Sequence, residues 1–263
     1  MLDPAQELTS VAQAGAPPPE LPPAAPRRRI LPFERIGALM EVVLCSGFPT
    51  QILVVAGLTG MGMRPRDAAG EWSPGFIVAM SLIDMVLVLG LVFFFLRTHR
   101  EPVGEFLLGQ RRPAREVLLG LALIPGAFLL VVLVLGTILA IAPELHNVPV
   151  NPFGRMLQTP RDAAIFAVVV MLAGGVREEV QRAFIIRRFD QYLGGAAVGI
   201  VLFSAVFGLG HVDQGYAAAI ATGLLGAAWG WVYWKRRSVI APVVSHAGFN
   251  LVQLVKYVTL TLR

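Results

Sequence analysis

The chain of 263 residues is 56% apolar and only 15% charged, and its mean hydropathy is +0.67. Soluble domains average about a quarter charged residues, so this composition excludes an ordinary water-soluble protein and indicates an integral membrane protein. The single cysteine, Cys45, excludes an intramolecular disulfide framework and a multi-cysteine zinc site. The net charge of +5 would suit nucleic acid, but the charges follow a membrane topology, so we expect no nucleic-acid partner.

The first 29 residues are rich in proline and poor in bulky apolar side chains. Such a segment cannot bury enough apolar surface to offset its ordering entropy, so we expect residues 1–29 to form a disordered tail. The tail lacks the apolar stretch of a secretory signal peptide. Arg27, Arg28 and Arg29 end it and favour a cytoplasmic location.

Seven apolar segments follow the tail, each close to the roughly 20 residues that a helix needs to cross a bilayer. Helices satisfy their own backbone polar groups in lipid, so we expect an all-α bundle of about seven transmembrane helices. The segments are residues 36–60, 76–96, 117–142, 163–187, 194–211, 216–234 and 239–262. We divide them into an N-terminal part with three helices, residues 30–160, and a core with four helices, residues 161–263.

Arginine and lysine are concentrated in every second loop, and this alternation sets the expected orientation. It predicts a multi-pass protein of the plasma membrane, with its N-terminus in the cytoplasm and its C-terminus outside. The basic segments are the tail and residues 97–115, 187–188 and 235–237. The aromatic residues expected in the cytoplasmic interfacial belt are Trp229, Trp231, Tyr233 and Trp234.

Polar residues inside the predicted membrane helices are the candidates for function. A charge at the centre of a membrane helix costs roughly 2.5–3.5 kcal/mol even on insertion scales, and such residues mark functional sites by default. The residues concerned are Glu41, Asp84, Glu178, Glu179, Arg182, His211, His246 and Asn250. For Asp84 and Glu41 two interpretations stay open, a place along a substrate path or a pair with an arginine.

The spacing of these residues puts several of them on shared helix faces. Arg182 follows Glu178 by four residues and Glu179 by three, so it can pair with either carboxylate. His246 and Asn250 are four residues apart and project to one side of the last helix. A buried ion cluster that only fixes helix packing is the alternative to a functional site.

The depths of the candidate residues in the membrane are expected to agree. If the fourth helix continues to about Asp190, a rise of ~1.5 Å per residue puts Glu178 about 20–25 Å and His211 about 25 Å from the turn that joins the fourth and fifth helices. His246 and Asn250 lie about 10–17 Å into the last helix. We therefore expect one layer of side chains between the middle of the membrane and its cytoplasmic face.

A carboxylate, two histidines and an amide in one layer can hydrolyse a peptide bond. Glu178, with His211, can hold and deprotonate a water molecule, while His246 and Asn250 can donate hydrogen bonds to the oxyanion that forms. Cys45 has no matched base, so covalent catalysis is not expected. No metal is required, although Glu178, His211 and His246 could together bind zinc.

These residues occur in three motifs, each on a separate predicted helix. The chain resembles the CAAX prenyl endopeptidase type II and bacteriocin-processing family of intramembrane proteases, also called the CPBP or ABI family. The resemblance covers about residues 163–262. The motifs are Glu178-Glu179-Val-Gln-Arg182-Ala-Phe184, Phe207-Gly-Leu-Gly-His211 and His246-Ala-Gly-Phe-Asn250.

The resemblance implies the same roles for Glu178, His211, His246 and Asn250, with Glu179 and Arg182 as supporting residues. The first motif departs from the family pattern, which places three residues between the glutamate pair and the arginine. Here only two intervene, and Ala183 occupies the usual arginine position.

Three functions are compatible with a bundle of this kind. We expect an intramembrane endopeptidase whose substrate is a peptide or a membrane protein segment, such as a prenylated C-terminal peptide or a leader peptide. The main alternative is a catalytically silent membrane scaffold or immunity-type protein with the same fold. A transporter with the glutamate pair as a proton relay ranks last, because no inverted repeat is visible in the sequence.

Overall fold

The computed structural model describes residues 30–68, 70–148 and 157–261, and the regular elements in this part of the chain are helices. The predicted all-α membrane bundle is therefore confirmed. Pro32–Arg263 forms one compact unit, which contains every helix described below. The expected disordered tail, residues 1–29, lies outside the described residues. In chain order the elements are α2 (Pro32–Leu44), α3 (Phe48–Gly60), α4 (Pro74–Thr98), α5 (Val103–Leu108), α6 (Pro113–Ile141), η1 (Pro143–Leu145), α7 (Pro160–Val169), η3 (Val170–Arg177), α8 (Glu178–Tyr192), α9 (Ala196–Leu209), η4 (Val212–Gln214), α10 (Tyr216–Arg236) and α11 (Ile240–Thr261).

Three helical stretches of the described chain are long and apolar enough to cross a membrane. They are Pro32–Gly60, Pro74–Thr98 and Val103–Ile141, and they correspond to the first three predicted spans. The four C-terminal spans are also helical, but α9 has only 14 residues. The count of seven spans therefore stays a prediction for the C-terminal half.

The first predicted span is two helices and not one, because the chain turns between α2 and α3. Gly47 has a φ of +87°, a left-handed conformation that side chains disfavour. A Cβ atom at Gly47 would lie only 3.1 Å from Nε2 of Gln181 on α8. The glycine therefore both permits the turn and lets the chain approach α8 closely.

The fourth predicted helix is one continuous element from Pro160 to Tyr192, built from α7, the π-helix η3 and α8. A capping box closes its N-terminal end, because Thr159 and Asp162 satisfy each other's backbone N–H groups. Its C-terminal end comes just before Gly194 and Gly195, which both have positive φ. The predicted continuation to about residue 190 is thus confirmed.

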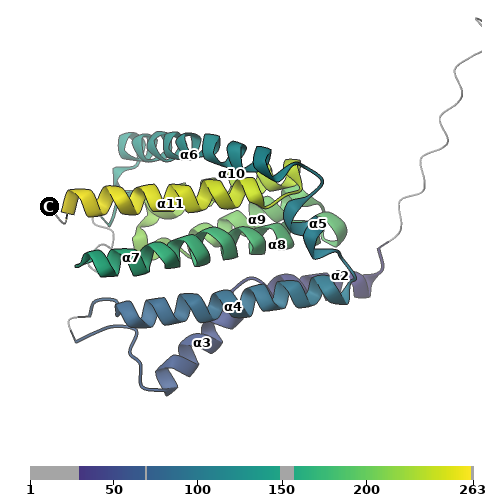
Figure 1. The fold of residues 1–263 in the computed structure, drawn as a ribbon, viewed down its shortest axis with the longest axis horizontal. Helices are drawn as coiled ribbons and strands as arrows, with labels where there is room; N and C mark the ends of the chain where they lie inside the picture. The colour runs from purple at the N-terminus through teal and green to yellow at the C-terminus, as the bar shows by residue number, and fades with distance from the viewer. Residues whose placement is uncertain (1–29, 69, 149–156, 262–263) are drawn as a thin grey trace, which may run out of the picture. The chain divides into compact units, whose positions relative to one another are not determined.

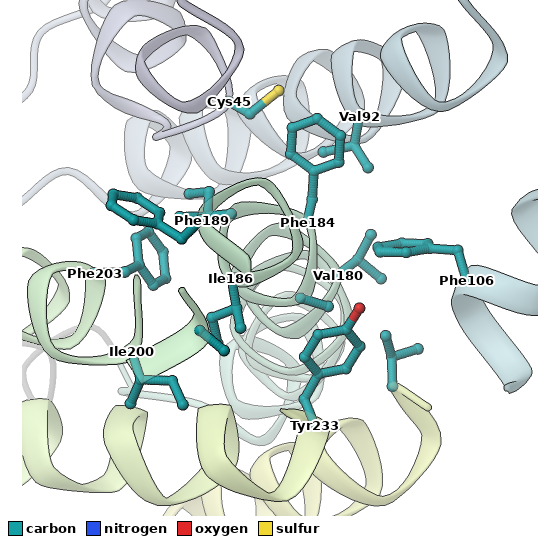
Figure 2. Packing of buried hydrophobic residues seen from close by; sticks show 14 of the residues in the cluster. Cys45, Val92, Phe106, Val180, Phe184, Ile186, Phe189, Ile200, Phe203 and Tyr233 are labelled. Carbon is teal, nitrogen blue, oxygen red and sulfur yellow. The ribbon is translucent and has the colours of Figure 1, made fainter. Parts of the chain in front are cut away.

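Helix α8 lies in the middle of the bundle, with other helices around it. It contacts α2, α4, α9, α10 and α11, and Figure 1 shows it in line with α7. In Figure 2, Phe184 points toward Cys45 and Val92, while Ile186 points toward Ile200. Of the charged residues of α8, Glu179, Arg182 and Arg188 are buried in this surrounding protein, which removes the cost of placing their charges in lipid.

Ion pairs join the N-terminal helices to the end of α8. The guanidinium of Arg188 is fully buried and lies 2.5 Å from Glu41 and 2.5 Å from Glu101. His99 contacts the other oxygen of Glu41, also at 2.5 Å. Of the two interpretations open for Glu41, the structure therefore supports the pair with an arginine.

Candidate functional site

The glutamate pair begins α8 directly after the π-helix η3. There η3 packs against α11 at Gly175, where an added Cβ atom would lie 2.7 Å from Cβ of Ala247. A side chain at this position would push the two helices apart. The glycine thus lets α11 bring His246, the neighbour of Ala247, up to the glutamate pair.

Glu179 is the buried member of the pair, and two cationic or hydrogen-bonding partners share one of its oxygens. The guanidinium of Arg182 contacts Oε1 of Glu179 one helical turn away. Nδ1 of His246 lies 2.7 Å from the same oxygen. The shifted arginine of the first motif therefore still reaches the glutamate pair, as expected.

Aromatic rings surround this ion cluster. Trp229 stacks on His246 with ring centroids 3.9 Å apart, and its Nε1 donates to Oγ of Ser245 at 3.0 Å. Phe207 lies under the Arg182 guanidinium, 4.5 Å from its ring centroid, and contacts the ring of His246 edge-on. These contacts restrict rotation of the His246 imidazole and surround the Arg182 guanidinium with aromatic rings.

The prediction of an aromatic belt at the end of the sixth helix is wrong for two of the four residues. Trp229 and Tyr233 are 3% and 2% exposed and belong to the interior. Trp231 is exposed and can face the membrane surface. The sequence pattern failed here because both faces of α10 are aromatic near its end, and periodicity alone does not say which face is buried.

Glu178 is more accessible than its neighbour, and its contacts with charged groups in the described part of the chain are longer than a hydrogen bond. Its side chain is 17% exposed, against 1% for Glu179. Oε2 of Glu178 lies 3.9 Å from Nε2 of His246, and Oε1 lies 3.9 Å from a guanidinium nitrogen of Arg177. The two adjacent carboxylates are thus in different environments: Glu179 is buried and hydrogen-bonded, and Glu178 is partly exposed.

His211 lies beyond the end of α9 and joins the cluster through Phe207. Its Nδ1 is 2.8 Å from the carbonyl oxygen of Phe207, which makes Nδ1 the donor and leaves Nε2 without a hydrogen bond to the described residues. The two rings contact each other, with centroids 4.8 Å apart. Phe207 thus contacts both histidine rings, and no hydrogen bond between His211 and Glu178 is present among the described residues.

Asn250 faces the π-helix from one turn further along α11. Its Nδ2 donates to the carbonyl oxygen of Val170 at 3.5 Å. A Cβ atom at Gly174 would lie 2.9 Å from the same nitrogen. The amide therefore sits against the η3 backbone, and the long hydrogen bond leaves it able to change partner.

The zinc site considered from the sequence does not fit the described residues. No group of three His, Cys, Asp or Glu side chains there has an arrangement that could hold a metal ion. In particular, Glu178, His211 and His246 do not form such a group.

Residues 160–252 match the family model described as Type II CAAX prenyl endopeptidase Rce1-like. This stretch therefore resembles an Rce1-like domain. It contains all three motifs identified in the sequence, and it supports the expected family. Searches of curated proteins and of solved structures found no match.

The Rce1-like family is a protease family, so a hydrolase role is supported at the level of the family. The domain runs from α7 into α11, and α2 to α6 lie outside the matched residues. The membrane character of the chain agrees with the family, since the three long apolar stretches precede the Rce1-like domain.

Sequence reasoning missed two residues that contact the site. Arg177 directly precedes the glutamate pair, and its charge inside a predicted membrane helix was the available signal. Trp229 stacks on His246 from another helix, and no local pattern indicates that contact.

Proposed function

We propose that the chain is an intramembrane endopeptidase in which Glu178 activates a water molecule for attack on a peptide carbonyl. The observation that carries this proposal is the separation of 3.9 Å between Oε2 of Glu178 and Nε2 of His246. It is too long for a direct hydrogen bond, and a water molecule in contact with both atoms fits such a gap.

The protonation of His246 follows from its hydrogen bond to Glu179. Glu179 has no proton to donate while it is ionised beside Arg182, so Nδ1 of His246 carries the hydrogen and donates it. Nε2 is then the nitrogen that faces Glu178. When this nitrogen takes a proton, the imidazolium becomes a donor for the oxyanion or for the leaving amine.

Asn250 and His211 complete the proposed machinery. Asn250 supplies a second donor to the oxyanion after its Nδ2 leaves the carbonyl of Val170. His211 presents its free Nε2 and assists Glu178 in holding the water. In this proposal Glu179 and Arg182 do not touch the substrate and serve to orient His246.

We place the reaction in the cytoplasmic half of the plasma membrane, on the basis of the arginine distribution and the expected depth of Glu178. The substrate is a peptide or a membrane protein segment, and the match to the Rce1-like family model makes prenylated C-terminal peptides the first class to test. Leader peptides are the second class.

The experiment uses the full chain reconstituted in liposomes and a library of farnesylated, unmodified and leader-type peptides. We expect cleavage of at least one class, unchanged by a chelator and lost in Glu178→Ala. His211→Ala should reduce the rate. Cleavage by both variants at the wild-type rate would show that the hydrolase proposal is wrong.

Two further outcomes of this experiment are informative. Activity that disappears with chelator and returns with zinc would overturn the metal-free mechanism. Folded wild-type protein that cleaves none of the peptide classes would favour the silent scaffold.

A further inference from the structure

Arg177 is a buried arginine that the mechanism above does not use. It is the last residue of η3, and its side chain is 11% exposed. Its guanidinium pairs with Asp84 of α4 and donates to Oε1 of Gln181 at 3.2 Å. It also lies 3.9 Å from Oε1 of Glu178, the proposed catalytic carboxylate.

Asp84 is held from a third helix. Its side chain is 1% exposed, and Oγ1 of Thr50 on α3 donates to it at 2.5 Å. Asp84 therefore has a partner on η3 and a partner on α3, and its position on α4 is well defined. Of the two interpretations that the sequence left open for Asp84, the structure therefore supports the pair with an arginine.

Gln181 connects Arg177 to the turn between α2 and α3. Its Nε2 donates to the carbonyl oxygen of Cys45 at 2.7 Å. Gly47, whose missing side chain makes room here, would place a Cβ atom 3.8 Å from a guanidinium nitrogen of Arg177. Arg177 thus pairs directly with Asp84 of α4, and it is connected through Asp84 to α3 and through Gln181 to the turn between α2 and α3.

The two oxygens of Glu178 are divided between two partners. Oε1 is the one near Arg177, and Oε2 is the one near His246, each at 3.9 Å. A carboxylate between these groups has a preferred rotation, because the positive charge of Arg177 attracts one oxygen and turns the other toward His246. The guanidinium does not bind Glu178 at hydrogen-bonding distance, so it orients the carboxylate without occupying it.

We propose that Arg177 is a positioning residue that aims Glu178 at the reacting water, and that Asp84 holds Arg177 in place for this purpose. The inference rests on the proposed function, because it needs Glu178 to be the base. It assigns a role in catalysis to α3 and α4, which lie outside the residues matched by the Rce1-like family model. Without Asp84, the guanidinium would be free to move onto Glu178 and block it.

The test measures kcat and KM of the full chain in liposomes with a quenched fluorescent farnesylated peptide. We expect Arg177→Gln to lower kcat roughly 10- to 100-fold, the size of effect that misplacing a catalytic group by about 1 Å produces. KM should stay within about twofold, because Arg177 does not touch substrate in this proposal. Arg177→Lys keeps the charge but not the forked geometry, and it should recover part of the loss.

Asp84→Asn should lower kcat as well, and the double variant with Arg177→Gln should be no worse than Arg177→Gln alone, because the two residues act as one unit. The matched control is Glu41→Gln. Like Asp84, Glu41 is a buried carboxylate of an N-terminal helix that pairs with a buried arginine on the long central helix. Arg188, its partner, is ten residues beyond Glu178, so Glu41→Gln should leave kcat close to the wild-type value.

The outcomes separate this inference from the proposed function. Three results would overturn the positioning role, provided that Glu178→Gln is inactive. They are a wild-type kcat in Arg177→Gln, a change in Arg177→Gln that is confined to KM, and a decrease of kcat in Glu41→Gln equal to that in Arg177→Gln. Full activity of Glu178→Gln would instead overturn the proposed function and this inference with it. Thermal unfolding in detergent identifies variants that fail to fold. If Arg177→Gln is one of them, the kcat values of Arg177→Lys and Asp84→Asn test the positioning role in its place.

Discussion

Gly175→Ala is a small change with a large expected effect, because Gly175 sets the distance between η3 and α11. The added Cβ atom would lie 2.7 Å from Cβ of Ala247. Carbon atoms pack best at about 3.5–4.0 Å, so the helices must separate locally by about 1 Å. Overpacking of this kind destabilises a protein by roughly 1–3 kcal/mol.

The same displacement acts on the site through His246, which adjoins Ala247. It would lengthen the contact of 2.7 Å between His246 and Glu179 beyond hydrogen-bonding distance and widen the gap of 3.9 Å to Glu178. A misplacement of about 1 Å can reduce a rate by the order of 10²-fold. We therefore expect kcat/KM of Gly175→Ala to fall by that order, with a lower Tm.

The assay is cleavage of the farnesylated peptide in liposomes, together with thermal unfolding in detergent. Gly126→Ala on α6 is the matched control, because nothing lies within 4 Å of a Cβ atom at Gly126. It should keep the wild-type rate and a Tm that is equal or higher, since alanine favours a helix over glycine by about 1 kcal/mol. Wild-type kcat/KM and Tm in Gly175→Ala would refute the close packing of η3 on α11.

Three other predictions concern separate parts of the structure. Trp229→Leu removes the ring that stacks on His246, so kcat/KM should fall about tenfold; an unchanged rate would show that the stacking does not hold the imidazole. Asn250→Ala should lower kcat roughly 10²- to 10³-fold with little change in KM, because it removes a proposed oxyanion donor; a loss in KM alone would contradict that role. Burial raises the pKa of Glu101, but the hydrogen bonds and charges of Arg188 and Arg187 together outweigh burial, so the pKa is lowered from its usual 4.5. The ion pair therefore stabilises the fold at neutral pH and loses its effect as the pH falls below about 4.5. Between pH 7 and pH 3 the Tm should fall less in Glu101→Gln than in wild type. An equal dependence of Tm on pH in the two proteins would contradict this prediction.

Much of the helical order could be predicted from apolar runs and turn residues. Gly194 and Gly195 mark the turn between the fourth and fifth helices, and the structure has it there. The extension of the fourth helix past Arg187 followed from matching the depths of Glu178 and His211, and α8 indeed ends at Tyr192. Element order thus follows from local signals in the chain.

The division of the first span into α2 and α3 could not be predicted from hydropathy. The polar residues next to Gly47 are too few to interrupt the apolar stretch, and Gln181 and Arg177, which lie close to the turn, come from a distant part of the chain. The π-helix η3 is similar, since one additional residue per turn leaves no mark on an apolar stretch. Both features depend on contacts far apart in sequence.

The composition of the candidate site was predictable, but its connections were not. The cost of charge in a membrane singled out Glu178, Glu179, Arg182 and His246, and the structure brings these four together. The sequence could not say that His246, and not His211, lies next to Glu178, because that depends on how α11 packs against η3. The pair between Asp84 and Arg177 was hidden for the same reason.

The proposed hydrolysis depends above all on Glu178, which activates the water that cleaves the peptide bond. The most direct measurement compares purified wild type with Glu178→Gln in matched liposomes, with the farnesylated peptide as substrate and the product masses as the readout. We expect two hydrolysis products from wild type and a rate lower by roughly 10²- to 10⁴-fold in Glu178→Gln, the usual contribution of a general base. The same products at the wild-type rate from Glu178→Gln would contradict it.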